Sequence, residues 1–155
     1  MDGLIISLDK WDSPAVHYPR KKLGKAKIEN HFLTKGFYRA NGQRPLGDTN
    51  RYAFYEATKR LKSTALTIDG KTWMVDDPPH WWTIQEYATQ YCGHVLVAGL
   101  GLGLIVHALS SNPKVTDITV VERSNHVISL VGPLVPKCNI VCEDWNEYTA
   151  DFKPD

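Results

Sequence analysis

Three spaced glycines form the pattern in this sequence that most suggests chemistry. Gly99, Gly101 and Gly103 directly follow the apolar run 95–98, and a second apolar run comes after them. Glycines at this spacing let the backbone turn tightly and approach a ligand with no Cβ in the way. A helix that begins after such a turn adds free N–H groups and a partial positive charge. The pattern is typical of a site for a nucleotide-like cofactor.

Two acidic residues occupy positions from which they can join these glycines. Glu122 ends the next apolar run, 19 residues after Gly103, and Asp144 follows a third run at 139–142. The carboxyl ends of parallel strands meet at one edge of a sheet, where ligands bind, and an acid on the second strand accepts hydrogen bonds from ribose hydroxyls. Glu143 is an alternative candidate for the acid that follows the third strand. A carboxylate that faces water and binds no ligand is the alternative interpretation for both Glu122 and Asp144.

The elements that must position these residues form a βαβαβ unit. Short apolar runs predict strands, longer ones between them predict helices, Ser124 is a helix N-cap and Gly132 a helix end. This order implies a parallel sheet with right-handed crossovers and the strand order 3-2-1, so we expect an α/β fold with half of a Rossmann-like sheet. The predicted strands are 95–98, 118–121 and 139–142, and the predicted helices are 102–109 and 125–131.

The N-terminal region, 1–92, is expected to precede a partial cofactor-binding domain, 93–155. Residues 1–50 show no lasting period and predict an irregular, partly ordered arm with short strands. The stretch 51–61 is compatible with a helix or a strand. Asp69-Gly70 between β-prone segments predicts a hairpin over about 65–75, and apolar spacings of three and four predict a helix over about 81–91.

Composition and charge narrow the class of protein. Of the 155 residues 43% are hydrophobic and 23% charged, as in a soluble globular protein, and the net charge is +1. Residues 1–92 carry four excess positive charges, typical of a solvated face, so we expect no nucleic-acid binding. The apolar run 95–109 is too short and too rich in glycine to span a membrane.

Cysteines and histidines point to a reduced, metal-free protein. Cys138 and Cys142 are about 13 Å apart if both lie in one strand, too far for a disulfide, and Cys92 makes the count odd. We therefore expect a cytoplasmic protein, and we see no signal peptide at the N-terminus. The six histidines lack the spacing of metal ligands, and none pairs with a cysteine, so no metal site is expected.

These motifs resemble the class I S-adenosylmethionine-dependent methyltransferase superfamily, and within it the spermidine-synthase-like branch. The glycine pattern resembles motif I, whereas a dinucleotide fingerprint needs glycine or alanine where this chain has Leu104. The segments 118–123 and 139–144 resemble the motifs that place acids on the ribose and the adenine. The hairpin and helix upstream resemble those before motif I in spermidine synthases. Val97, two residues before the first glycine, is apolar, as the residue at this position tends to be in that branch.

The resemblance implies a transferase that uses S-adenosylmethionine or its decarboxylated form. The glycine turn would pass under the amino-acid portion, Glu122 would hold the ribose and Asp144 would meet the adenine. Methyl and aminopropyl transfer both stay open, the acceptor is unknown and no catalytic residue is assigned. The cofactor-binding residues that the resemblance implies are Gly99, Leu100, Gly101, Gly103, Glu122, Arg123, Asp144 and Trp145.

The chain departs from this family where it ends at Asp155, before an expected fourth strand. The strand 95–98 would then have an open edge, which invites pairing with another chain. We expect a fragment of a longer protein, with cover by the N-terminal segment or a homodimer through this edge as alternatives. The aminopropyl-transfer acid of spermidine synthases has no counterpart.

Two other functions compete with the transferase. One is an NAD-type oxidoreductase, which Leu104 disfavours, and the other is a non-catalytic Rossmann-like module for binding or assembly. His80, in the segment 78–82, is a candidate general base. The aromatic residues of that segment are candidates for stacking on a ligand or for a packed aromatic lid over a small core.

Overall fold

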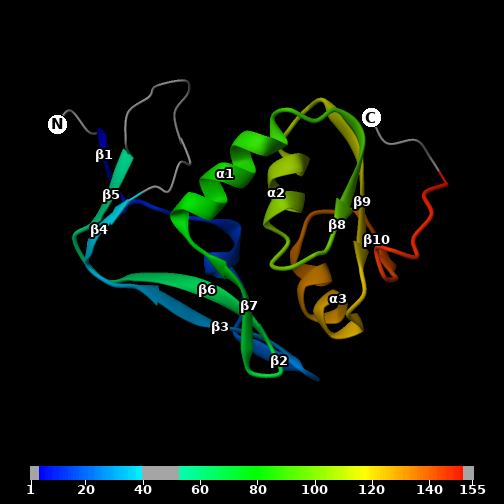
Figure 1. Cartoon of the computed structure of the whole chain (residues 1–155), viewed down its shortest axis with the longest axis horizontal. Coiled ribbons are helices and arrows are strands. Elements are labelled where there is room, and N and C mark those ends of the chain that lie inside the picture. Colours follow the sequence, from blue (N-terminus) through cyan, green and yellow to red (C-terminus); the bar gives the residue numbers. More distant parts are fainter. Residues whose placement is uncertain (1–3, 40–52, 152–155) are drawn as a thin grey trace.

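Strands dominate the first half of the molecule, and strands alternate with helices in the second (Figure 1). The structure is a computed structural model that describes residues 4–39 and 53–151. The strands are β1 Leu4–Ser7, β2 Lys21–Leu23, β3 Ala26–Leu33, β4 Gly36–Arg39, β5 Ala53–Ala57, β6 Leu61–Ile68, β7 Lys71–Asp76, β8 Gly93–Ala98, β9 Val115–Glu122 and β10 Asn139–Cys142. The helices are α1 Pro78–Ala88, α2 Leu104–Ser110 and α3 Asn125–Val131, with 3-10 turns at Pro14–His17 and Gly132–Leu134.

An antiparallel sheet of order β2-β3-β6-β7 forms one layer. β3 pairs with β6 along eight residues, and its first positions alternate between buried Ala26, exposed Lys27 and buried Ile28. Such alternation is the mark of a strand with one face on a core. This part of the predicted arm with short strands thus forms regular strands, and β3 is longer than the short strands expected. The lysines face water here and do not interrupt the strand.

A smaller sheet of order β1-β5-β4 lies beside the first (Figure 1). β1 and β5 pair in parallel, and β4 pairs with β5 antiparallel. The ambiguity over 51–61 is resolved as strand at 53–57 and again from Leu61, while residues 51 and 52 lie outside the described ranges.

The predicted hairpin at 65–75 is confirmed as β6 and β7, although β6 begins earlier, at Leu61. Asp69 and Gly70 both have positive φ, 51° and 74°. A two-residue turn with this twist matches the twist of antiparallel strands, and aspartate followed by glycine tolerates it best.

The helix expected at about 81–91 is α1 and runs from Pro78 to Ala88, so the predicted start was three residues too late. Asp77 caps it, because its carboxylate accepts the backbone N–H of His80 at 2.9 Å. Pro78 and Pro79 stand in the first turn, where a missing N–H is tolerated. The two prolines thus belong to the first turn of the helix, which the apolar spacing alone placed later.

The second half forms a three-stranded parallel sheet of order β10-β9-β8, as the predicted order 3-2-1 required. Figure 1 shows α2 and α3 on the same side of this sheet, the side that faces the antiparallel layer. α3 has the predicted bounds, and Ser124 caps it through Val127 N–H at 3.3 Å. α2 begins at Leu104 and not at 102, because Gly103 is left-handed. The described chain is thus mixed α/β, with a parallel sheet, an antiparallel sheet and the smaller mixed sheet.

β8 differs from the strand that we expected. An apolar run such as 95–98 is typical of a strand buried on both faces, yet only Val95 is buried and Ala98 is exposed. Within the described ranges β8 pairs with β9 alone, so it lies at the edge of the sheet. Strands of a parallel sheet read as apolar when both faces are covered, and here helices cover one face.

One hydrophobic cluster joins the two halves of the chain. Ile28 and Leu66 of the antiparallel sheet belong to the same core as Leu104, Val106 and Val120. No helix within residues 4–39 and 53–151 combines the length and hydropathy that a bilayer crossing requires. The core thus fixes the antiparallel layer against the helices of the parallel one.

A buried tyrosine adds polar contacts to this interface. The Tyr18 hydroxyl donates to the Leu102 carbonyl oxygen at 3.0 Å and lies 2.8 Å from Nε2 of His107. Burial raises the pKa of Tyr18 and lowers the pKa of His107, so both side chains are neutral near pH 7. Neutral partners suit a hydrogen bond that lies inside the core.

A buried carboxyl ends β7. Asp76 has no exposed surface, and its carboxylate accepts the Ser13 hydroxyl, while Oδ1 has no partner among the described residues. Burial raises the pKa of Asp76 to about 6, and the Ser13 hydrogen bond only partly offsets this effect.

We predict that this carboxyl makes the protein less stable as the pH rises from about 4 to about 6. Its pKa in the folded state lies above the unfolded value, so the stabilisation present below pH 4 is lost as the carboxyl ionises inside the fold. Asp76→Asn should remove a pH-dependent loss on the order of 2–3 kcal/mol in the free energy of unfolding. Urea denaturation across this range measures it, with the exposed Asp117→Asn as control. Identical pH profiles for Asp76→Asn and wild type would refute this.

Candidate functional site

The carboxyl ends of the three parallel strands meet at one edge. Ala98 of β8 is in register with Val121 of β9, and Glu122 is in register with Cys142 of β10. Beyond the strands, Gly99 N–H donates to the Val121 carbonyl at 2.8 Å, and Glu143 N–H donates to the Glu122 carbonyl at 3.2 Å. The backbone therefore brings the glycine turn and the acidic segment after β10 to either side of Glu122.

The carboxylate of Glu122 binds two turns at once. Oε2 accepts the backbone N–H of Leu100 at 2.9 Å, and Oε1 accepts the backbone N–H of Ser124 at 2.8 Å. A carboxylate has about four lone-pair positions, so roughly one position on each oxygen remains for a further donor. Glu122 is half-buried and lines a cavity, which leaves those positions available to a ligand with paired hydroxyls.

The three glycines of the turn all have left-handed backbone, with φ of 83°, 53° and 71° for Gly99, Gly101 and Gly103. A Cβ at Gly99 would have no atom within 4 Å, so this residue opens on the cavity. A Cβ at Gly101 would lie 2.7 Å from the sulfur of Met74, and one at Gly103 would overlap Val135. Gly103 therefore serves the packing of the core and does not line the cavity.

Met74 of β7 is a residue of this site that sequence reasoning missed. Its sulfur accepts the backbone N–H of Leu102 at 3.3 Å and lies against Gly101. A thioether is a weak acceptor that fits irregular gaps, which suits a contact against bare backbone. The hairpin thus supports the glycine turn from the antiparallel layer, and no motif in the sequence signals this contact.

The segment after β10 supplies the remaining predicted residues. Asp144 Oδ1 accepts from the backbone and side-chain nitrogens of Asn146 at 2.9 and 3.0 Å, which shapes a tight turn. Asp144 Oδ2 lies 4.0 Å from the guanidinium of Arg123, whose side chain is 68% exposed. A pair this exposed adds little stability, so both groups remain accessible to a ligand. Trp145 is also exposed, at 45%.

These elements enclose a cavity of about 890 Å³. All the predicted cofactor-binding residues except Gly103 line it, and Glu143 lines it as well. The opposite wall comes from β6, β7 and α1, and of these the sequence pattern had linked only the start of α1, through His80, to the site. The residues of that wall are Leu66, Ile68, Trp73, Met74, His80 and Ile84.

The aromatic segment at the start of α1 divides between this wall and the core. His80 lines the cavity, but Trp81 is buried in the core and Trp82 packs against Tyr55 with ring centroids 5.0 Å apart. The packing of Trp81 and Trp82 against buried residues therefore agrees with the packed aromatic lid over a core, and neither indole is placed to stack on a ligand in this cavity. Helical geometry explains the division, because consecutive residues on a helix point in different directions.

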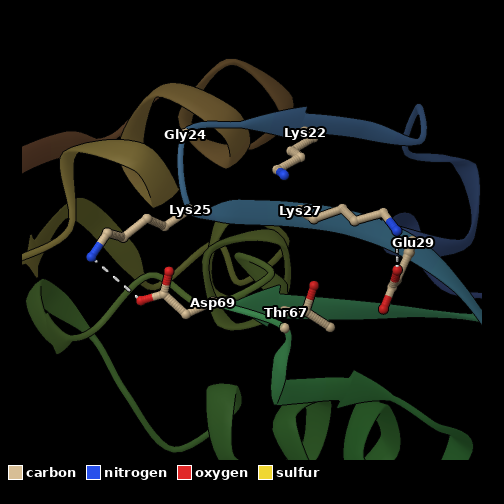
Figure 2. Close-up of a pocket in the computed structure, with 8 residues that line it drawn as sticks. Lys22, Gly24, Lys25, Lys27, Glu29, Thr67 and Asp69 are labelled. Atoms are coloured by element: carbon tan, nitrogen blue, oxygen red, sulfur yellow. Dashed lines mark ion pairs between the residues drawn. The ribbon is translucent and has the colours of Figure 1, made fainter.

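A second cavity of about 470 Å³ lies between the β2–β3 strands and the β6–β7 turn (Figure 2). Figure 2 shows Lys25 paired with Asp69, at 3.5 Å, and Lys27 paired with Glu29, at 2.5 Å. Charges that are mutually paired and exposed to water are typical of a solvated surface. This hollow lacks the apolar wall of the larger cavity, which is the better candidate for a ligand site.

Comparison with known proteins yields no family for this chain. No protein-family profile matches it, and no curated protein sequence matches it. Among the residues that the structure describes, no three histidine, cysteine or acidic side chains are grouped as metal ligands. A functional proposal therefore depends on the geometry of the larger cavity.

We predict that Gly101→Ala destabilises the protein more than Gly99→Ala does. Both substitutions place an alanine in left-handed backbone, which costs about 1–2 kcal/mol, but only alanine at 101 also meets the sulfur of Met74. Urea denaturation of the two variants measures the difference. In a Met74→Ala background the difference should shrink, since the obstructing atom is gone. Equal losses for the two variants in the protein that retains Met74 would contradict the contact between Gly101 and the Met74 sulfur.

Proposed function

We propose that this chain is an S-adenosylmethionine-dependent transferase that binds its cofactor in the 890 Å³ cavity. The parallel sheet would then be part of a Rossmann-like sheet. The observation that carries the proposal is Glu122, a strand-end carboxylate that holds the glycine turn and keeps lone pairs for two hydroxyls. A ribose presents such a pair of hydroxyls.

The residues of the cavity fit the parts of this cofactor. Glu122 would accept the two ribose hydroxyls, and the open side of Gly99 would leave room for the amino-acid portion or, in the decarboxylated form, for its amine. Asp144 and Trp145 would bind the adenine, one by hydrogen bonding and the other by stacking. These roles use exposed or half-exposed groups, which a ligand can reach without breaking the core.

The cofactor would supply a carbon bound to a positively charged sulfur, which a nucleophile attacks. The protein would supply orientation, since alignment of the two reactants alone accounts for much of the rate in such transfers. Methyl and aminopropyl transfer place the same demands on Glu122 and the glycine turn, so both remain within the proposal.

A dinucleotide cofactor fits this turn less well. The dinucleotide fingerprint has a third small residue, for close packing of helix and strand, where this chain has Leu104. Leu104 has no exposed surface and belongs to the hydrophobic core. Its side chain fills the space that a small residue would leave, which favours S-adenosylmethionine over NAD.

We predict that the protein binds S-adenosylhomocysteine in calorimetry and binds NAD more weakly. The ribose contact is tested by comparing adenosine with 2′,3′-dideoxyadenosine on the wild type and on Glu122→Gln. The wild type should prefer adenosine by tenfold or more, because hydrogen bonds to a charged group contribute about 1.5–3 kcal/mol. The preference should largely disappear in Glu122→Gln, whose neutral amide replaces one acceptor oxygen with a donor.

This design separates binding from folding, because any loosening of the turn by Glu122→Gln affects both ligands alike. Asp117→Asn, at an exposed position of β9, is the matched control and should keep the wild-type preference. The same hydroxyl preference in wild type and Glu122→Gln would remove Glu122 from the ribose site. A folded wild type that binds no S-adenosylhomocysteine would favour a non-catalytic module.

A further inference from the structure

Negative charge is confined to one side of the 890 Å³ cavity. Its three carboxylates, Glu122, Glu143 and Asp144, all come from the edge of the parallel sheet. The wall from β6, β7 and α1 contributes aliphatic, thioether and aromatic side chains and a single titratable group, His80. An ammonium group next to this wall would lose water without gaining a carboxylate, which is unfavourable. The wall therefore suits an uncharged, largely apolar molecule.

Two exposed indoles border the same cavity from opposite sides. Trp73 of β7 is 60% exposed, and Trp145, after β10, is 45% exposed. Large apolar side chains are normally covered, and exposed ones mark binding surfaces when they gather at one place. Indoles stack on flat aromatic rings, so the wall favours a planar ligand. At about 890 Å³ the cavity is near the upper end of the usual range for ligand pockets, about 300–1,000 Å³, which leaves room beside a nucleoside.

His80 has a defined tautomer. Its Nδ1 lies 3.1 Å from the carbonyl oxygen of Val75, and a carbonyl only accepts, so Nδ1 carries the proton. In the neutral ring Nε2 then holds a lone pair, and no hydrogen bond to Nε2 forms within residues 4–39 and 53–151. The capping bond from His80 N–H to Asp77 holds the backbone of the same residue. A fixed imidazole with an available lone pair is suited to accept a proton.

From these observations we propose that the wall from β6, β7 and α1 binds an acceptor with a planar aromatic ring and a phenolic hydroxyl, and that Nε2 of His80 takes the hydroxyl proton. This inference rests on the proposed cofactor site. Transfer forms one bond from the acceptor oxygen to carbon and breaks one carbon–sulfur bond, whose electron pair stays on the sulfur. The phenolic proton ends on His80, so no further reactant is needed.

The test uses 4-nitrophenol as a probe, because its phenolate absorbs visible light and its neutral form does not. The full chain, saturated with S-adenosylhomocysteine, is titrated with 4-nitrophenol and separately with spermidine. The wild type should bind 4-nitrophenol with increased phenolate absorbance and should not bind spermidine. His80→Gln should bind 4-nitrophenol without that increase, and Trp73→Ala should bind it about threefold to tenfold more weakly.

Two variants outside the cavity serve as controls. Tyr87→Ala, at a 56% exposed position of α1, matches Trp73→Ala, and His17→Gln, at an exposed position, matches His80→Gln. Both should bind 4-nitrophenol and raise its phenolate absorbance as the wild type does.

The outcomes separate this inference from the proposed function. If S-adenosylhomocysteine binds but 4-nitrophenol does not, or spermidine binds in its place, the acceptor assignment is overturned and the cofactor site stands. The assignment also fails if the phenolate signal persists in His80→Gln. If S-adenosylhomocysteine does not bind, the proposed function and this inference both fail.

Discussion

The site is organised by one carboxylate that accepts hydrogen bonds from two loops. Glu122 binds the Leu100 N–H of the turn after β8 and the Ser124 N–H of the turn after β9. Both turns carry backbone donors that have no partner in the strands themselves, and unpaired donors are costly where water is excluded. A charged acceptor between them sets the path of the chain on both sides and leaves a ligand-accessible carboxylate at their junction.

The glycine turn depends equally on the antiparallel layer behind it. Met74 touches Gly101 and accepts Leu102 N–H, and Tyr18 donates to the Leu102 carbonyl. The turn is thus held by Glu122 on one side and by β7 and the segment before β2 on the other. Since the cavity lies between the two layers, its shape follows from their packing, and neither layer alone provides a site.

Local sequence patterns predicted the elements of the parallel layer well. The order of strands, the bounds of α3 with its Ser124 cap, and the Asp69-Gly70 hairpin were all confirmed, because short-range chemistry controls each of them. The errors arose where local and long-range effects differ. β3 was not predicted as one long strand because its polar residues face water on one side only, and α1 was predicted to begin too late because its first turn carries two prolines in place of the apolar spacing of a helix. The side chains of β8 are less buried than its apolar composition suggested.

The sequence by itself determined where a strand leads into a glycine-rich turn and which acids lie at the ends of the neighbouring strands. Residue type and spacing along the chain are enough to identify both features. The sequence also placed Gly99, Glu122 and Asp144 at one edge of a sheet. Only the tertiary structure decided what stands opposite. Leu66, Trp73 and Met74 reach the cavity because the antiparallel sheet packs against α2 and α3 through a shared core. Such packing joins residues far apart in the chain, and no local period encodes it.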